Sequence, residues 1–169
     1  MEIERKYLVK NLPENIENYD SHMLTQGYIS TTPSVVRIRR WDDEYILTIK
    51  SQGLQERIEI EKALTIEEFG ELSTMVIGNI ISKKRYIIPI NEVPASGLKI
   101  ELDIFQDKFE GLIYAEVEFP DKETADSFIE PEFFGKEITT EPEFQNSSLS
   151  EMSPEKIKEF IDKANAMNK

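Results

Sequence analysis

The chain has 169 residues, and 20 lysines and arginines against 33 aspartates and glutamates leave a formal net charge of −13. A domain of this length can bury roughly 70% of the surface that the unfolded chain exposes. The absence of cysteine excludes disulfides, thiolate catalysis and cysteine-ligated zinc. The acidic balance argues against a nucleic-acid partner. No run approaches the roughly 20 apolar residues that span a membrane, and no signal peptide is evident, so we expect a single cytoplasmic domain over residues 1–169.

Alternation of apolar and polar residues dominates the chain, and this period of two predicts strands. In chain order, the expected strands cover residues 2–9, 23–31, 35–41, 44–50, 57–61, 79–89, 97–105 and 112–119. Turn signals such as Thr32-Pro33 and Gln52-Gly53 separate them. Eight strands with short connections predict a mainly β (α+β) fold, built as an antiparallel barrel or strongly curled sheet.

Helices are expected at few places. Thr65 with Glu68 three residues later is a capping box, and an apolar stripe over residues 66–76 follows it. Ser153-Pro154 predicts the start of a C-terminal helix at about 153–166. Shorter helices are expected near residues 14–19 and 122–129, whereas residues 141–151 are interpreted as a polar connection.

The charges on the strands have an unusual distribution. Residues two apart on one strand share a face, and many such pairs carry the same sign. These pairs are Glu2 and Glu4, Arg37 and Arg39, Glu59 and Glu61, Lys83 and Arg85, and Glu116 and Glu118. A solvated face is the ordinary interpretation for one strand alone. Because neighbouring like charges repel, their repetition over most strands indicates that a group of opposite charge lies between them.

The alternate positions on these strands are apolar, as at Ile58 and Ile60, and burying each large side chain contributes about 1.5–3 kcal/mol. We therefore expect the apolar face to point outward under the helices and the charged face to point inward. A closed barrel of about eight strands can hold one small ligand. The expected lining is Glu2, Glu4, Lys6, Arg37, Arg39, Lys50, Glu59, Glu61, Lys83, Arg85, Asp103, Glu116 and Glu118.

This set of side chains indicates a particular ligand chemistry. Arginine and lysine clusters recognise phosphate, whereas paired carboxylates hold hard divalent cations such as Mg²⁺ or Mn²⁺. A lumen with both kinds of group is suited to the metal complex of a polyphosphate.

The chain resembles the CYTH superfamily, the triphosphate tunnel metalloenzymes. Glu2-Ile3-Glu4-Arg5-Lys6 matches the family's ExExK signature at the extreme N-terminus. Further matches follow in family order at residues 26–30, 36–39, 47–50, 59–62, 83–86, 101–103 and 115–118. Residues 135–139 and 144–149 resemble the small bacterial branch, which includes inorganic tripolyphosphatases. The resemblance implies an eight-stranded closed tunnel with helices outside, and hydrolysis of a small-molecule triphosphate with two divalent metal ions.

The resemblance also implies roles for individual residues. Glu4, Glu116 and Glu118 would hold the metal ion on the phosphates, while Glu2, with Glu59 and Glu61, would support the metal or the attacking water. Asp103 would join these metal ligands or pair with a cation. Lys6, Arg37, Arg39, Lys50, Lys83 and Arg85 would bind phosphate oxygens, and Glu2, Glu4, Lys6 and Arg39 are the expected catalytic set.

Several alternatives stay open on the sequence alone. The same family contains adenylate cyclases of the class IV type and thiamine or nucleoside triphosphatases, and a polyphosphate-binding module without activity would use the same lumen. His22 is interpreted as a surface group, Tyr28 as an even choice between packing and catalysis, and Trp41 as a packing residue at a strand end. A monomer and a homodimer are equally compatible with the chain.

Overall fold

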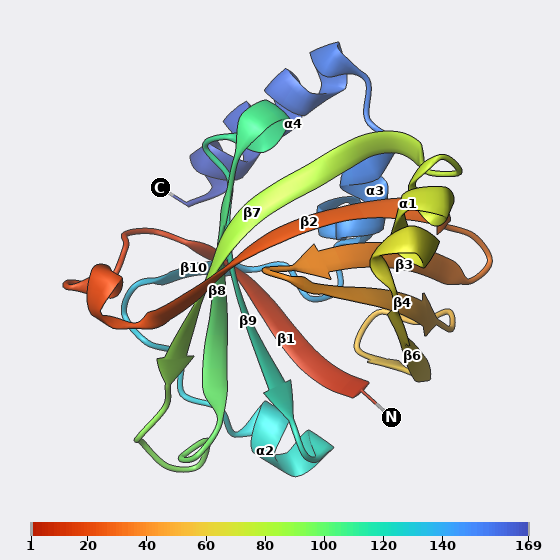
Figure 1. Cartoon of the computed structure of the whole chain (residues 1–169). Helices are drawn as coiled ribbons and strands as arrows, with labels where there is room; N and C mark the ends of the chain where they lie inside the picture. The colour runs from red at the N-terminus through yellow and green to blue at the C-terminus, as the bar shows by residue number, and fades with distance from the viewer. Residues whose placement is uncertain (1, 169) are drawn as a thin grey trace.

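The computed structural model describes residues 2–168, which form one strongly curved antiparallel sheet with helices packed against it (Figure 1). The strands are β1 (Glu2–Val9), β2 (Asp20–Ser30), β3 (Val35–Trp41), β4 (Glu44–Lys50), β5 (Glu56–Arg57), β6 (Glu59–Leu64), β7 (Ile77–Pro89), β8 (Lys99–Phe105), β9 (Ile113–Phe119) and β10 (Phe134–Glu137). The helices are α1 (Ile66–Ser73), α2 (Lys122–Asp126), α3 (Asn146–Ser150) and α4 (Pro154–Met167), with 3₁₀ turns η1 (Ile16–Asn18), η2 (Asp107–Phe109) and η3 (Pro142–Phe144). The predicted mainly β class is confirmed.

The sheet closes almost completely into a barrel. Its strands follow the order β10-β1-β9-β8-β7-β2-β3-β4-β6, and β5 pairs separately with β1. Because β5 directly precedes β6 in the chain, its pairing with β1 joins the two sides of the barrel. This seam is short, with Glu2 opposite Arg57 and Ile3 opposite Glu56. We use the word seam for this β1–β5 pairing.

The predicted count of eight strands is corrected to ten among the described residues. The segment expected at 57–61 is divided into β5 and β6, because the chain changes partner from β1 to β4 between them. β10 is an additional short strand, Phe134–Glu137, which pairs with the outer edge of β1. Four residues that include Gly135 and Lys136 carry too little alternation to predict a strand.

The two longer helices begin where their capping residues predict. The Thr65 Oγ1 accepts a hydrogen bond from the Glu68 amide at 3.1 Å, and the Glu68 carboxylate accepts one from the Thr65 amide at 3.0 Å. Ser153 accepts from the Lys156 amide at 3.3 Å at the start of α4. None of the helices within residues 2–168 is long and apolar enough to cross a membrane.

The apolar core is divided between the outside and one end of the barrel. One cluster, which includes Tyr7, Leu102 and Val117, packs on the outer face beneath α2. A second cluster brings inward-facing residues of β1, β8 and β9 together with η3, α3 and α4, so apolar side chains fill one end of the barrel. Its members include Leu8, Ile81, Phe105, Tyr114, Phe144, Leu149 and Phe160. The polar lumen is therefore confined to the remaining part of the barrel.

Two expectations about the surface are wrong. Ile58 and Ile60 are 63% and 60% exposed, because α1 covers the neighbouring outer face around Tyr45 and Phe69 and does not extend over them. Residues 141–151, expected to be a polar connection, contain η3 and α3 and bury Phe144 and Leu149. Phe144 and Leu149 are the apolar residues of this otherwise polar segment, and they pack at the end of the barrel.

Candidate functional site

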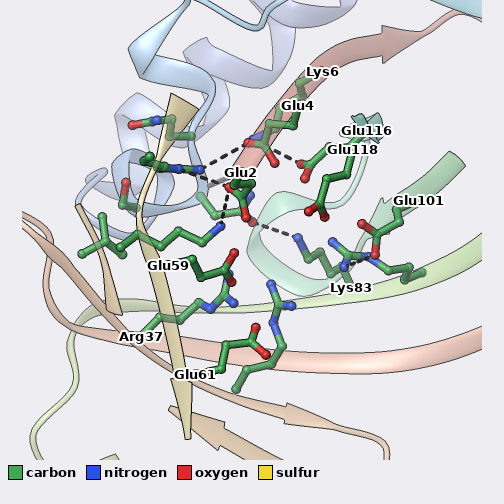
Figure 2. A pocket seen from close by; sticks show the side chains of 18 of the residues that line it. Glu2, Glu4, Lys6, Arg37, Glu59, Glu61, Lys83, Glu101, Glu116 and Glu118 are labelled. Carbon is green, nitrogen blue, oxygen red and sulfur yellow. Dashed lines mark hydrogen bonds and ion pairs between the residues drawn. The ribbon is translucent and has the colours of Figure 1, made fainter. Parts of the chain in front are cut away.

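A cavity of about 660 Å³ occupies the charged part of the barrel (Figure 2). Side chains from all nine strands β1 to β9 line it, together with the start of α3. Its ionisable lining residues are Glu2, Glu4, Lys6, Tyr28, Arg37, Arg39, Lys50, Arg57, Glu59, Glu61, Lys83, Arg85, Lys99, Glu101, Glu116 and Glu118. The period of two places these side chains inside because successive residues of a strand point to opposite faces.

Glutamates dominate one side of the lumen, which we call the acidic wall: Glu2 and Glu4 of β1, Glu59 of β6, and Glu116 and Glu118 of β9. The register brings the strands' carboxylates together, since Glu4 lies opposite Glu118 and Lys6 lies opposite Glu116. Figure 2 shows the carboxylates of Glu4, Glu116 and Glu118 pointing into the same space. This wall is the candidate cation site.

The acidic wall has more negative charge than its neighbours neutralise. Burial, followed by the nearby carboxylate of Glu116, raises the pKa of Glu4 well above its usual range. Burial and a hydrogen bond that the protonated Glu2 donates to Glu59 raise the pKa of Glu2, and burial with three neighbouring glutamates raises that of Glu118. Burial opposes ionisation of Glu116 too, but Lys6 and the hydrogen bond from Glu4 hold its pKa well below the usual value.

Three cations are interleaved with these carboxylates. The Lys50 Nζ lies 3.2 Å from Glu2 Oε1, and the Lys6 Nζ lies 3.6 Å from Glu116 Oε2. Arg57 reaches two carboxylates, with Nε 3.4 Å from Glu2 Oε1 and Nη2 3.2 Å from Glu4 Oε1. The raised pKa values show that these cations neutralise the wall only in part.

The opposite side of the lumen, which we call the cationic wall, carries Arg37 and Arg39 of β3 and Lys83 and Arg85 of β7. Arg37 donates from Nη2 to the Thr48 hydroxyl at 3.1 Å, and Arg39 donates from Nε to Gln26 Oε1 at 3.0 Å. Neither arginine forms an ion pair with a carboxylate within residues 2–168, and the buried Arg37 Nε has no hydrogen-bond partner there. Unpaired guanidinium groups of this kind are suited to an anion.

The surroundings of two members of the cationic wall, Arg39 and Lys83, disfavour their charge, whereas Asp103 and Glu101 overcome the effect of burial and raise the pKa of Arg85. Burial, with Arg37 and Arg85 nearby, lowers the pKa of Arg39 to about 9. Burial also lowers the pKa of Lys83 to about 7, although Asp103 partly opposes the shift. Such shifts arise when charged groups lose water without gaining enough countercharge. An anionic ligand would supply the missing countercharge.

Asp103 lies among the cations and is not part of the cavity lining. Its carboxylate contacts Lys83 Nζ at 2.7 Å and accepts from Arg85 Nε at 2.7 Å and Nη2 at 2.9 Å. Burial opposes its ionisation, but Arg85 and Lys83 hold its pKa well below the usual range. Of the two roles that the sequence left open for Asp103, the arrangement corresponds to pairing with cations.

The oxygen donors of the acidic wall are the ligands that Mg²⁺ and Mn²⁺ prefer. Their excess of negative charge also fits a cation. As they stand, however, no three carboxylate or imidazole groups among residues 2–168 converge closely enough to hold a metal ion. Lys50 and Arg57 instead contact the carboxylates of Glu2 and Glu4.

The structure brings together all the predicted lining residues except Asp103. Besides Tyr28, it adds eight residues that were not predicted to line the site: Val35, Trp41, Arg57, Lys99, Glu101, Gln145, Asn146 and Ser147. Asn146 accepts a hydrogen bond from Lys83 Nζ at 3.1 Å, and Glu101 accepts one from Arg85 Nη1 at 2.7 Å. The period of two would have included Arg57 and Glu101, whereas Asn146 reaches the lumen from a helix far along the chain.

The aromatic and imidazole candidates have different positions. Tyr28 is buried in the lining and its hydroxyl accepts from Gln26 Nε2 at 3.1 Å. Trp41 also lines the cavity, with the Arg85 guanidinium 5.5 Å from its ring centroid. His22 lies outside the lining, where its Nδ1 is 2.7 Å from Asp42 Oδ2.

Comparisons with known proteins show the family to which the chain belongs. The family model for the CYTH domain matches residues 1–159. An inorganic triphosphatase of Nitrosomonas europaea is 35% identical over 151 residues, which cover 88% of this chain and 96% of that protein. An inorganic triphosphatase of Acetivibrio thermocellus is 32% identical, covering 88% and 92%.

A solved structure extends the likeness to three dimensions. The crystal structure of an inorganic triphosphatase superposes with a TM-score of 0.67 at 31% identity, covering 91% of this chain and 97% of that one. The predicted resemblance is thereby confirmed, and the chain belongs to the CYTH domain family.

Proposed function

We propose that this protein is a divalent-metal-dependent triphosphatase that hydrolyses inorganic tripolyphosphate. The observation that carries the proposal is the division of one lumen into an acidic wall and a cationic wall, each of which contains groups that lack countercharge. A metal ion complements the first wall and a phosphate chain complements the second, so a metal triphosphate complements both. The names of the relatives support the same activity.

The cationic wall would bind and orient the phosphate chain. Arg37 and Arg39, which have no carboxylate partner among residues 2–168, are proposed to contact phosphate oxygens, with Lys83 beside Asn146. Cations that neutralise charge developing on the phosphoryl group stabilise the transition state as well as the bound substrate. The attack of water on phosphorus then breaks one bridging P–O bond and releases orthophosphate and diphosphate.

The acidic wall would hold Mg²⁺ or Mn²⁺. Glu4, Glu116 and Glu118 are proposed as ligands of the metal on the phosphates, and Glu2, Glu59 and Glu61 as the groups around a second ion. When bound, a divalent cation supplies charge neutralisation and Lewis-acid activation of water. Lys6, which lines the cavity and lies 3.6 Å from Glu116, is proposed to contact phosphate from that side.

A nucleoside triphosphate is the second candidate substrate, because Trp41 gives the lumen one large aromatic surface. Cleavage to nucleoside diphosphate, cyclisation to cyclic AMP and binding without turnover would be the corresponding alternatives. We propose a cytoplasmic location, where metal triphosphates are present, and action on the small molecule alone as monomer or homodimer.

The test is a product analysis on the purified protein. Orthophosphate and cyclic AMP are measured side by side from tripolyphosphate, ATP and thiamine triphosphate, with Mg²⁺, with Mn²⁺ and with EDTA. The proposal expects orthophosphate from tripolyphosphate, complete loss of activity in EDTA and recovery on addition of excess metal. Full activity in EDTA, cyclic AMP as the main product, or binding without hydrolysis would each contradict it.

A further inference from the structure

Arg57 occupies a position that the fold itself determines. It belongs to β5, the two-residue strand of the seam, where it lies opposite Glu2 of β1. Residues opposite each other in an antiparallel pair have side chains on the same face. The Arg57 side chain is only 10% exposed and lines the cavity. Closure of the barrel therefore places this guanidinium against the acidic wall.

Arg57 differs from the other cations of the acidic wall in the number of carboxylates it contacts. Lys50 pairs with Glu2, and Lys6 pairs with Glu116. Arg57 alone among the described residues contacts both Glu2 and Glu4, through Nε and Nη2. A planar guanidinium can bridge carboxylates in this way because it presents several donors in a fixed geometry. It thus sits between two of the oxygen groups that a metal ion would need.

We propose that Arg57 is an internal counter-cation, a positioning residue that neutralises Glu2 and Glu4 in the metal-free protein and competes with a free divalent cation for them. The inference rests on the metal dependence proposed above. A guanidinium and a metal ion repel each other at the same carboxylates. Entry of the metal therefore requires Arg57 to release at least one of them.

The competition has a consequence for the substrate. A displaced guanidinium would remain in the lumen, because the backbone of β5 stays paired with β1. Phosphate oxygens are strong partners for a guanidinium that has lost its carboxylates. Free metal, which offers no such partner, would bind weakly, whereas metal triphosphate supplies both a cation for the glutamates and an anion for Arg57.

The test compares Mn²⁺ binding in the absence of any triphosphate, by isothermal titration calorimetry, for the wild type, Arg57→Gln and Arg57→Lys. The proposal expects Arg57→Gln to bind Mn²⁺ at least about threefold more tightly, because the competitor is gone. Arg57→Lys keeps a cation at the same site and should bind close to the wild type. Arg57→Gln should also unfold at a lower temperature in EDTA, and Mn²⁺ should reverse most of that loss.

Arg5→Gln is the matched control. Arg5 is 16% exposed and also pairs with a glutamate, Glu137, but on the outer side of β1 beside β10. Its loss should lower stability without changing Mn²⁺ affinity. Unchanged or weaker Mn²⁺ binding by Arg57→Gln, with binding by the wild type intact, would overturn the role of Arg57 alone. Absence of Mn²⁺ binding by every protein would contradict the metal dependence itself and this role with it.

A measurement on the wild type covers the case in which Arg57→Gln does not fold. Butanedione modifies accessible guanidinium groups, and mass spectrometry locates the adducts. Arg57 should be modified severalfold faster with Mn²⁺ present than with EDTA, because the metal displaces it from Glu2 and Glu4. The labelling rate of Arg5 should not change. Equal rates for Arg57 in both conditions would overturn the proposal.

Discussion

The acidic wall and the cationic wall of the lumen show the same imbalance with opposite sign. On β1 and β9, burial and neighbouring carboxylates raise the pKa values of Glu4 and Glu118. On β3 and β7, burial and neighbouring cations lower those of Arg39 and Lys83. The two walls face each other across one cavity and do not neutralise each other. The site is therefore organised for a ligand that carries both signs of charge.

Removal of one charge from the acidic wall should have the largest effect on activity. Glu4→Gln keeps the shape of the side chain but removes its charge, and loss of one partner of a buried ionic contact costs about 3–5 kcal/mol. We expect kcat/KM for tripolyphosphate to fall at least about 100-fold, with the loss only partly relieved by excess Mn²⁺. Steady-state phosphate release over a range of Mn²⁺ concentrations measures it.

Glu67→Gln supplies the control, since Glu67 is exposed in the first turn of α1 on the outside of the barrel. It should leave kcat/KM within about twofold of the wild type. Comparable losses in Glu4→Gln and Glu67→Gln would mean that the effect arises from general charge and not from the acidic wall.

Removal of one charge from the cationic wall should have a somewhat smaller effect on activity. Arg39→Ala removes a lumen cation without a carboxylate partner, and such contacts are typically worth about 2–5 kcal/mol with an anionic ligand. We expect a loss of about 30-fold or more in kcat/KM, shared between kcat and KM because the guanidinium also stabilises transition-state charge.

The adjacent Arg40 lies on the outer face of the same strand, where it is exposed and donates to the Asp42 carbonyl. Arg40→Ala should therefore keep nearly normal kinetics. Normal kinetics for Arg39→Ala with impaired kinetics for Arg40→Ala would reverse the assignment of faces. Circular dichroism of both variants confirms that the comparison is made between folded proteins.

The alternation of residues along the strands was sufficient to predict the barrel and its inward charges, because it depends only on local strand geometry. The division of those charges into two walls depends on the order of the strands around the barrel. Arg57 is a single cation among glutamates and so forms no pair of like charge on its strand. Glu101 shares a strand face with Asp103, but only Asp103 was predicted to line the lumen; the partner of Glu101 is Arg85 on another strand. Asn146 and the apolar packing at the closed end of the barrel depend on contacts between distant segments. The alternation of residues along a single strand cannot predict contacts of this kind.

The apolar end of the barrel limits where a substrate longer than tripolyphosphate can lie. Because apolar residues fill that end, a nucleoside attached to the triphosphate must remain at the open side, near Trp41. Each phosphate of tripolyphosphate can contact lumen cations, whereas an adenosine adds bulk and removes a terminal charge. We expect kcat/KM for tripolyphosphate to exceed that for ATP at least tenfold, about 1.4 kcal/mol. An equal or higher value for ATP at the same metal concentration would favour the nucleotide as substrate.

The smallest expected effect is on the stability of the protein. Its measurement tests the charge of the cationic wall in the absence of any ligand. Burial lowers the pKa of Lys83 from 10.5 to about 7. Between these values the unfolded chain keeps the lysine proton and the folded chain loses it, so the free energy of unfolding should rise with pH by up to about 1.4 kcal/mol per unit from this group. Lys83→Met removes the titrating group, and Arg85 still pairs with Asp103 in its absence. Urea unfolding of both proteins between about pH 7.5 and 9.5 should therefore show the stability of the wild type rising relative to the variant. Parallel pH profiles would mean that Asp103 and Asn146 keep Lys83 charged, and that the cationic wall is better neutralised than the acidic wall opposite it.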